Sequence, residues 1–229
     1  MCFIFLKKYI RFHFNFLTML RQLPLFPLRL VVFPQEKLNL HIFEPRYRQL
    51  INECEKTGVT FGIPAFIDDN LVEIGTEVRL VRVEKRYPGG EMDIRTEGVG
   101  IFKLEEFFTE GRGRMYPSAD ILPLPIDKEG DFIKNEDILG YVRELFAALN
   151  IQKEVPPHND RFLTFDVAHH VGFTLEQEYA FLCIRTELER QNFMLEHLRK
   201  TLPVVREMEH LRQRALMNGH FKHVLPPNF

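Results

Sequence analysis

The chain of 229 residues has no tryptophan, only one serine and only three cysteines, and the last two shortages exclude common kinds of chemistry. The serine, Ser118, lies in YPSAD rather than in the G-x-S-x-G turn of a serine hydrolase. Cys2, Cys54 and Cys183 are far apart, without the C-x-x-C pairs of zinc sites or the even number of a disulfide framework. We therefore expect reduced thiols and a cytoplasmic protein.

Motifs that hold phosphates or metals are also missing. There is no G-x-x-x-x-G-K-[ST] and no H-E-x-x-H. The nearest glycine-rich piece, Gly98-Val99-Gly100, lies in a strand pattern, where glycine indicates a bulge or a close backbone approach. His169 and His170 are adjacent and would point in different directions on a helix. We expect no cofactor, no metal and no catalytic residues, so the chain is predicted not to be an enzyme.

The balance of charge argues against nucleic acid as the main partner. The net charge is -2, whereas nucleic-acid binding usually requires a basic face. A local basic cluster, Arg79, Arg82, Lys85 and Arg86, falls on one predicted hairpin. It keeps RNA binding open as a weaker alternative.

Residues 1–18, MCFIFLKKYIRFHFNFLT, hold five phenylalanines, and basic residues interrupt them. The stretch has no signal-peptide cleavage site and is too short for a membrane span. Met19 stands immediately before the patterned region. We interpret 1–18 as an upstream extension, with a mis-assigned start codon as one origin, in preference to a membrane-surface anchor.

Residues 19–126 show the pattern of short strands. β-branched residues dominate EVRLVRVEKRY, and Pro88-Gly89-Gly90 provides the turn to a partner strand. The predicted strands are 59–67, 77–87, 91–107 and 112–125. One early helix starts at Pro45, because the apolar residues that follow it recur at helical spacing. Short strands with one helix predict a small, partly closed β-barrel.

Residues 127–217 change to the 3.6-residue period of helices. We predict helices over 135–150 and 162–171, and a third whose start is capped by Thr174 with Gln177. A final helix has a leucine-rich stripe, which should be buried against other helices, and Pro203 should kink or divide it. The stripe consists of Leu188, Leu195, Leu198, Leu202, Val205 and Leu211. Residues 218–229 are predicted to be a tail.

The stretch LPLFPLRLVVFPQEKLNLHIFEPRYRQLINEC combines a dense apolar run with three prolines before the helix. Proline cannot donate to a sheet ladder, so it belongs at strand starts, edges and bulges. Pro24, Pro27 and Pro34 should therefore break the run into short strands. The apolar side chains from Leu25 to Phe33 can then face the barrel interior or the helix.

This stretch resembles the start of the Lon protease N-terminal (substrate-binding) domain. FGIPAF, EIGTEVRLVRVEKRYPGGEMDIRTEGVGIFKLEEF and FTLEQEYAFLCIRTELERQNFMLEHL are similar to later parts of that domain, in the same order. The resemblance runs from about Leu20 to Met217. It implies an α+β fold, a PUA-like β-barrel joined to a C-terminal α-helical bundle, as a stand-alone domain. It does not imply proteolysis, because the ATPase and protease modules of Lon are absent from this sequence.

The resemblance suggests a non-catalytic module that binds exposed hydrophobic or unfolded polypeptide, as an adaptor in protein quality control. The candidate peptide-binding residues are Phe43, Tyr47, Phe61, Phe66 and Tyr87, and core packing is the competing interpretation of each. An alternative is a helical scaffold that pairs with itself or with a separate ATPase or protease subunit. An enzyme, which would have to use Ser118 or a cysteine, is the weakest alternative.

Overall fold

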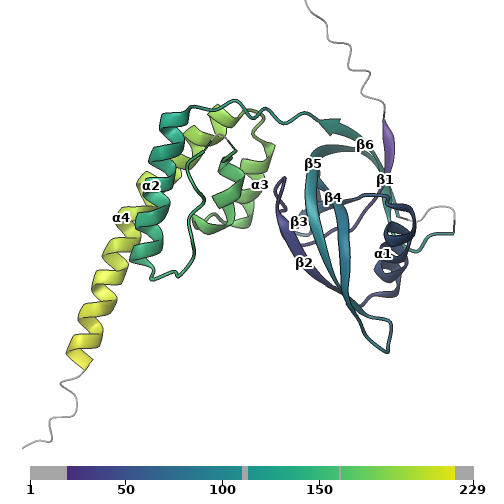
Figure 1. Cartoon of the computed structure of the whole chain (residues 1–229), viewed down its shortest axis with the longest axis horizontal. Helices are drawn as coiled ribbons and strands as arrows, with labels where there is room; N and C mark the ends of the chain where they lie inside the picture. The colour runs from purple at the N-terminus through teal and green to yellow at the C-terminus, as the bar shows by residue number, and fades with distance from the viewer. Residues whose placement is uncertain (1–19, 110–112, 160, 220–229) are drawn as a thin grey trace, which may run out of the picture.

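The computed structural model describes residues 20–109, 113–159 and 161–219. The predicted extension 1–18 and residues 220–229 of the predicted tail lie outside the described residues. Figure 1 shows a β-rich part, the barrel (21–124), beside a helical subdomain (132–219). The elements are β1 (Arg21–Pro24), β2 (Lys37–Ile42), α1 (Pro45–Thr57), β3 (Phe61–Ile67), β4 (Asn70–Arg86), β5 (Met92–Phe108), β6 (Ser118–Leu124), α2 (Phe132–Ala148), the 3₁₀ helix η1 (Thr164–His170), α3 (Leu175–Cys183) and α4 (Glu187–Gly219).

The six strands form one antiparallel sheet in the order β1-β6-β5-β4-β3, and β2 pairs with β5. The long strand β5 is the centre of the sheet, because it pairs with β2 over 92–97, with β4 over 92–103 and with β6 over 101–108. After β1 the chain makes parallel bridges to β3, Leu25 with Gly62 and Leu28 with Ala65. These bridges close the sheet into a small barrel. The predicted α+β class, with an early helix and C-terminal helices, is confirmed.

Helix α1 begins at Pro45, as predicted, and ends at Gly58, whose φ of 72° suits glycine. Its buried face is the one given by the sequence spacing. The side chains of this face, Tyr47, Leu50, Ile51 and Cys54, enter the barrel core together with Phe26, Phe61, Val78 and Ile94. The sequence pattern therefore predicted both the helix and its orientation.

The prolines of the opening stretch do interrupt its strands. Pro24 is the last residue of β1, and the chain from Pro27 to Pro34 belongs to no strand. The apolar residues between them are buried, except Leu28 and Leu30, which are half-buried. Phe33 differs from the prediction, because its ring enters the core of the helical subdomain instead of the barrel interior.

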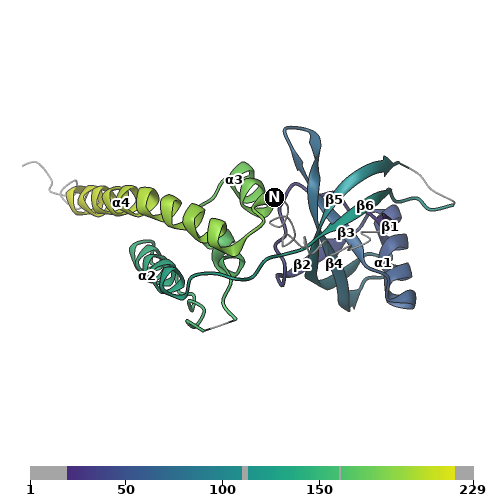
Figure 2. The ribbon, with the colours of Figure 1, turned by 90° about the horizontal axis from the view of Figure 1, so that it is seen from above.

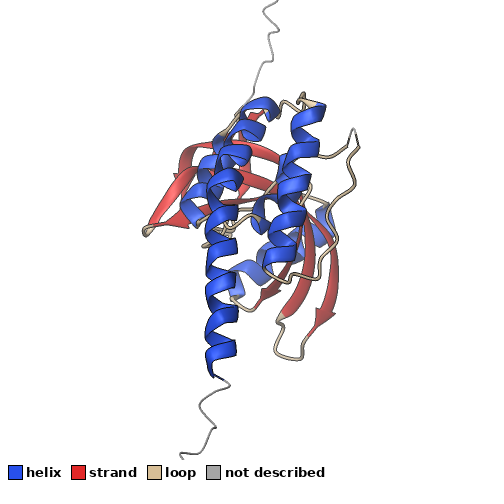
Figure 3. Cartoon of the chain, turned by 90° about the vertical axis from the view of Figure 1, so that its left-hand side faces the viewer, coloured by secondary structure: helices blue, strands red, loops and turns tan. Residues whose placement is uncertain are grey.

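In the helical subdomain, α2 and α4 lie side by side (Figure 3). They run parallel: Lys134 Nζ donates to Asn192 Oδ1 near their starts, and Arg206 pairs with Glu144 further along. The predicted capping box at the start of α3 is confirmed, since Thr174 and Gln177 bond each other's backbone N–H groups. Both Figure 1 and Figure 2 show the end of α4 projecting away from the barrel.

Two helical predictions need correction. Residues 162–171 form a 3₁₀ helix over 164–170 rather than an α-helix. Here the Asp166 N–H reaches only three residues back, to the Leu163 carbonyl, while the Thr164 N–H donates to Glu187. Of the two outcomes predicted for Pro203, division of the helix is wrong, because α4 continues through this residue, and a kink stays a prediction. Pro203 is exposed, so water can solvate the carbonyl that loses its helical partner.

The leucine stripe of α4 is buried only in its middle. Leu195, Leu198 and Leu202 are buried, whereas Leu188 is 44% and Leu211 is 52% exposed. The prediction that the stripe is buried against other helices is therefore confirmed for Leu195, Leu198 and Leu202 and wrong, within this chain, for Leu188 and Leu211. Its distal part lies on the segment of α4 that projects from the subdomain.

A buried ion pair ties the loops of the helical subdomain together. Glu187 and Arg190 are 1% and 0% exposed, and their side chains meet at 2.8 Å. Arg190 also donates to the carbonyls of Ile184 and Asp127, and Glu187 accepts from the Thr164 N–H at 2.7 Å. These bonds satisfy the buried charges and join α4 to η1 and to the linker that follows β6.

A second polar contact joins the barrel to the helices. His169 of η1 lies between two carboxylates, with Nδ1 2.7 Å from Glu178 of α3 and Nε2 3.0 Å from Glu36 of the loop before β2. Ionised carboxylates only accept hydrogen bonds, so Nδ1 and Nε2 must each carry a proton and the imidazole ring is positively charged. Burial alone would lower the pKa of His169, but the bonds with Glu178 and Glu36 outweigh it and raise the pKa to about 9.

Candidate functional site

The five aromatic residues predicted to contact peptide separate into core and surface. Tyr47 is 5% and Phe61 is 0% exposed, and both rings pack on Phe26 in the barrel core. They fill the barrel interior, so neither is accessible to a peptide. Phe43 is 62% exposed, directly after β2, and it is the most accessible of the set. Phe66 and Tyr87 are half-buried.

Two of the predicted residues, Phe43 and Tyr87, lie on either side of His41, where β2 ends beside the β4–β5 turn. The His41 and Phe43 rings are stacked with centroids 6.3 Å apart, and the Tyr87 ring meets His41 edge-on at 5.7 Å. Lys85 Nζ lies 4.4 Å from the centre of the Tyr87 ring. With Asp93, these residues form what we call the Phe43 surface.

Asp93 orients two rings of the Phe43 surface through hydrogen bonds. His41 Nδ1 and the Tyr87 hydroxyl each donate to one oxygen of the Asp93 carboxylate, both at 2.7 Å. These two hydrogen bonds lower the pKa of Asp93, so the carboxylate stays ionised and the two rings keep fixed orientations. The sequence reasoning named the aromatic residues but missed His41 and Asp93. No pattern in the sequence connects these two residues, because only the register of β2 on β5 brings His41 opposite Asp93.

The nucleophiles named from the sequence are in poor positions for catalysis. Ser118 is 5% exposed and pairs with β1 and β5 at the start of β6. Burial raises the pKa of the Cys54 thiol to about 12, and burial also raises that of Cys183, so both remain protonated and weakly nucleophilic at neutral pH. Among the described residues, no group of three or more His, Cys, Asp or Glu side chains could hold a metal ion.

Three of the four cations of the basic cluster are paired with carboxylates, one of them on α1, and Lys85 lies against the Tyr87 ring. Arg79 pairs with Glu97 at 2.6 Å, and Arg86 with Glu55 at 2.5 Å. Glu84 receives Arg82 at 2.7 Å and Arg95 at 3.3 Å. Nucleic-acid binding relies on cations that are available to phosphates, so the hairpin gives little support to that alternative.

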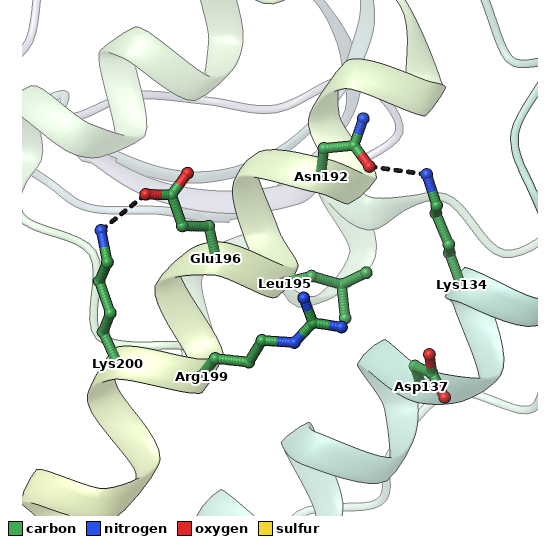
Figure 4. A pocket seen from close by; sticks show the side chains of 7 residues that line it. All are labelled: Lys134, Asp137, Asn192, Leu195, Glu196, Arg199 and Lys200. Atoms are coloured by element: carbon green, nitrogen blue, oxygen red, sulfur yellow. Dashed lines mark hydrogen bonds and ion pairs between the residues drawn. The ribbon is translucent and has the colours of Figure 1, made fainter.

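Among the hollows outside the Phe43 surface, two involve the helical subdomain and differ in character. A charged groove of about 580 Å³ runs between α2 and α4 (Figure 4), where Lys134 bonds Asn192 and Lys200 bonds Glu196 at 2.6 Å. An apolar cleft of about 310 Å³ lies where the barrel meets the helices, and its lining includes Ile101, Leu124, Leu182 and Cys183. Within the described ranges, no helix combines the length and the apolar character needed to cross a membrane.

A closed small barrel followed by parallel helices gives the chain an α+β fold. Residues 22–200 match the family model of the ATP-dependent protease La (LON) substrate-binding domain. The chain therefore belongs to this family, and the resemblance seen in the sequence is confirmed.

Solved structures show the same fold. The chain is similar to the crystal structure of a Lon N-terminal domain protein from Xanthomonas campestris, with a TM-score of 0.60 and 20% identity over 77% of this chain and 98% of that one. It is also similar to the N-terminal domain of a Mycobacterium avium complex Lon protease, with a TM-score of 0.56 and 13% identity over 78% and 98%. A comparison with curated proteins finds no match.

Proposed function

We propose that this protein binds exposed hydrophobic or unfolded segments of other polypeptides through the Phe43 surface, without catalysing a reaction. The observation that carries the proposal is Phe43 itself, a phenylalanine 62% exposed beside two ordered rings. A large apolar ring kept in water on a rigid support is typical of a binding anchor. Membership of a substrate-binding family agrees with this role.

The buried serine and the protonated thiols support a binding role in preference to catalysis. We further propose that the protein acts as an adaptor in protein quality control, presenting unfolded clients to a separate machine. The two free cysteines of the described residues, Cys54 and Cys183, support a location in the reducing cytoplasm.

The test uses the full chain and reduced, carboxymethylated α-lactalbumin, which stays unfolded, as the fluorescent probe. Phe43→Ser should weaken binding about tenfold, because the variant loses the burial of one aromatic ring. Phe132→Ser is the matched control, since Phe132 is 53% exposed on α2, and it should change the affinity less than about twofold. No binding at tens of micromolar, or equal losses in the two variants, would refute the proposal.

A second candidate function, a helical scaffold, is supported by the projecting end of α4. Val204, Met208 and Leu211 are 58%, 64% and 52% exposed, and their spacing of four and three residues is that of a coiled-coil seam. These three exposed residues would pair with a second copy of the chain or with a helix of an ATPase or protease subunit. Light scattering across a range of concentrations tests the first case: a constant monomeric mass, unaltered by Leu211→Glu, would refute self-pairing.

A further inference from the structure

The barrel has one regular strand edge that is left unpaired. Strand β2 pairs with β5 on one side, and within the described residues no strand pairs with its other side. Its six residues keep one continuous register, without a bulge. The side chains of Lys37, Asn39 and His41 are exposed. An unpaired edge of this kind presents a row of backbone N–H and C=O groups to an added strand.

A second stretch of strand edge, on β4, also lacks a strand partner among the described residues, but its features disfavour the addition of a strand. The segment 79–86 of β4 extends beyond its partner β3, so it too has a free side. Its pairing with β5 shifts register twice, between Leu80 and Arg82 and between Val83 and Lys85. Exposed charged side chains occupy most of it. Bulges and charges are the usual protection of edges, and β2 has no bulge and far less charge.

The two ends of β2 lead to surfaces of different chemistry. The end at His41 runs directly into the Phe43 surface. The start, at Lys37, lines a cleft of about 390 Å³ together with Lys153 and His170 of the helical subdomain. Lys153 contacts His170, whose pKa is lowered by burial and by the charge of Lys153, so a neutral ring accepts from the ammonium.

The Lys37 end carries two ammonium groups without an ion-pair partner. Among the described residues the lysines that pair with a carboxylate are Lys103 and Lys200, so Lys37 and Lys153 make no ion pair. The cleft also holds two carboxylates: Glu36 bonds the protonated His169 and the Phe33 N–H, and Asp166 accepts from the Leu163 N–H. The two unpaired ammonium groups can therefore receive a negative group of a ligand.

From these observations we infer that the bound polypeptide adds to the free edge of β2 as an extended strand. The inference rests on the proposed function and specifies how the ligand is held. A side chain of the added strand, aromatic or apolar, lies on the Phe43 surface, and an acidic side chain or a terminal carboxylate lies near Lys37 and Lys153. Six strand residues extend about 20 Å, so a peptide of about eight residues reaches both ends. Backbone pairing makes the binding tolerant of sequence, and the two ends add preference.

The experiment starts from the ten-residue segment of carboxymethylated α-lactalbumin that binds the full chain most tightly in a tiled array. Each backbone N–H of that peptide is then methylated in turn. In an added strand only every second N–H faces the neighbour, so the losses of affinity should alternate. We expect about a fivefold loss at facing positions and less than about twofold at the positions between them.

Hydrogen exchange of the full chain locates the strand. On addition of the peptide, the amides of 37–42 that face away from β5 should exchange at least about tenfold more slowly, and those of 79–86 should not change. Lys37→Glu should weaken binding of a peptide with a terminal carboxylate about tenfold. Lys56→Glu is the charge-matched control, because Lys56 is exposed on α1, on the opposite side of the barrel from β2 (Figures 1 and 2).

The outcomes separate the two proposals. Failure of α-lactalbumin to bind at all refutes the proposed function, and the edge inference with it. Binding that falls with Phe43→Ser, but without alternation along the methylated peptide or protection of 37–42, overturns only the edge inference. It would indicate side-chain binding on the surface or in the apolar cleft. Alternation with protection of 37–42 supports both.

Discussion

Phe33 of the barrel stacks on Phe165 of the helical subdomain, with ring centroids 5.4 Å apart and an interplanar angle of 23°. Phe181 meets the Phe33 ring edge-on, with centroids 5.9 Å apart. Phe33, which precedes β2 in the chain, therefore lies inside the core of the helical subdomain. Phe33→Ala should lower the free energy of unfolding by about 3–5 kcal/mol, because it leaves a cavity between the two parts. Urea unfolding followed by circular dichroism at 222 nm measures the change.

The control for Phe33→Ala is Phe43→Ala, which removes an exposed ring and should change the free energy of unfolding by less than about 0.5 kcal/mol. The shared core also predicts one transition, in which helical circular dichroism and hydrogen exchange of the barrel strands respond together. Two separate transitions in the unaltered protein, or equal midpoints for the two variants, would contradict the role given to Phe33.

Local patterns were the part of the fold that the sequence could predict. The buried face of α1 and the capping box of α3 depend on residues a few positions apart, so their spacing was sufficient. The aromatic site was only half predicted. Residue type cannot tell whether a phenylalanine faces the inside of a barrel, as Phe61 does, or the water, as Phe43 does.

Contacts between distant segments were out of reach of the sequence. The burial of Arg190 depends on carbonyls of Ile184 and Asp127 that are brought together only by the fold. Likewise, which core buries the Phe33 side chain depends on how the helical subdomain packs against the barrel. Charged and aromatic residues at such junctions therefore appear as ordinary surface or core residues until the tertiary structure is known.

The ion pair of Glu187 and Arg190 should be costly to break. Arg190→Met leaves the buried Glu187 carboxylate without its charge partner, so we expect a loss of about 3–5 kcal/mol in the free energy of unfolding at pH 7.5. Burial already raises the pKa of Glu187, and removal of Arg190 should raise it further. The deficit should therefore shrink at pH 5, where Glu187 can protonate.

Urea unfolding of Arg190→Met at pH 7.5 and pH 5 makes that comparison. The matched control is Arg206→Met, which breaks the exposed pair with Glu144 and should cost less than about 1 kcal/mol at either pH. A deficit of equal size in the two variants would show that burial of the pair does not matter.

His169 predicts how stability depends on pH. Its partners exist only in the folded protein, where the pKa is about 9, against 6.5 for the free side chain. The stabilisation is fully present below about pH 6.5, and it is lost as the pH rises through about 9. His169→Gln should therefore be less stable than the unaltered protein at pH 6, and the difference should shrink toward pH 10. Urea midpoints at four pH values measure it.

His158→Gln is the control for the pH series, since the half-buried His158 stacks on Phe132 and has no carboxylate partner among the described residues. Its difference from the unaltered protein should not vary in the same way. If the His169→Gln deficit stayed constant from pH 6 to pH 10, the protonated bridge between Glu36 and Glu178 would be refuted.

At Gly98 of β5 the chain before β2 crosses in direct backbone contact. Gly98 accepts from the Gln35 N–H and donates to the Glu36 carbonyl, both at 2.9 Å. A Cβ at this position would overlap the carbonyl oxygen of Phe33 and press on Pro34 at 3.2 Å. Both obstacles are backbone atoms, so the loop would have to move. Gly98→Ala should therefore lower the free energy of unfolding by about 1–3 kcal/mol.

Gly100, two residues further on the same strand, provides the matched control, because a Cβ there meets nothing within 4 Å. Gly100→Ala should be neutral or stabilising by about 0.5 kcal/mol, since alanine reduces the freedom of the unfolded chain. Urea midpoints distinguish the two substitutions. Gly98→Ala should also speed hydrogen exchange in 37–42, because the displaced loop leads directly into β2. Equal midpoints would contradict the close crossing, and normal exchange in 37–42 would mean that β2 holds its register without it.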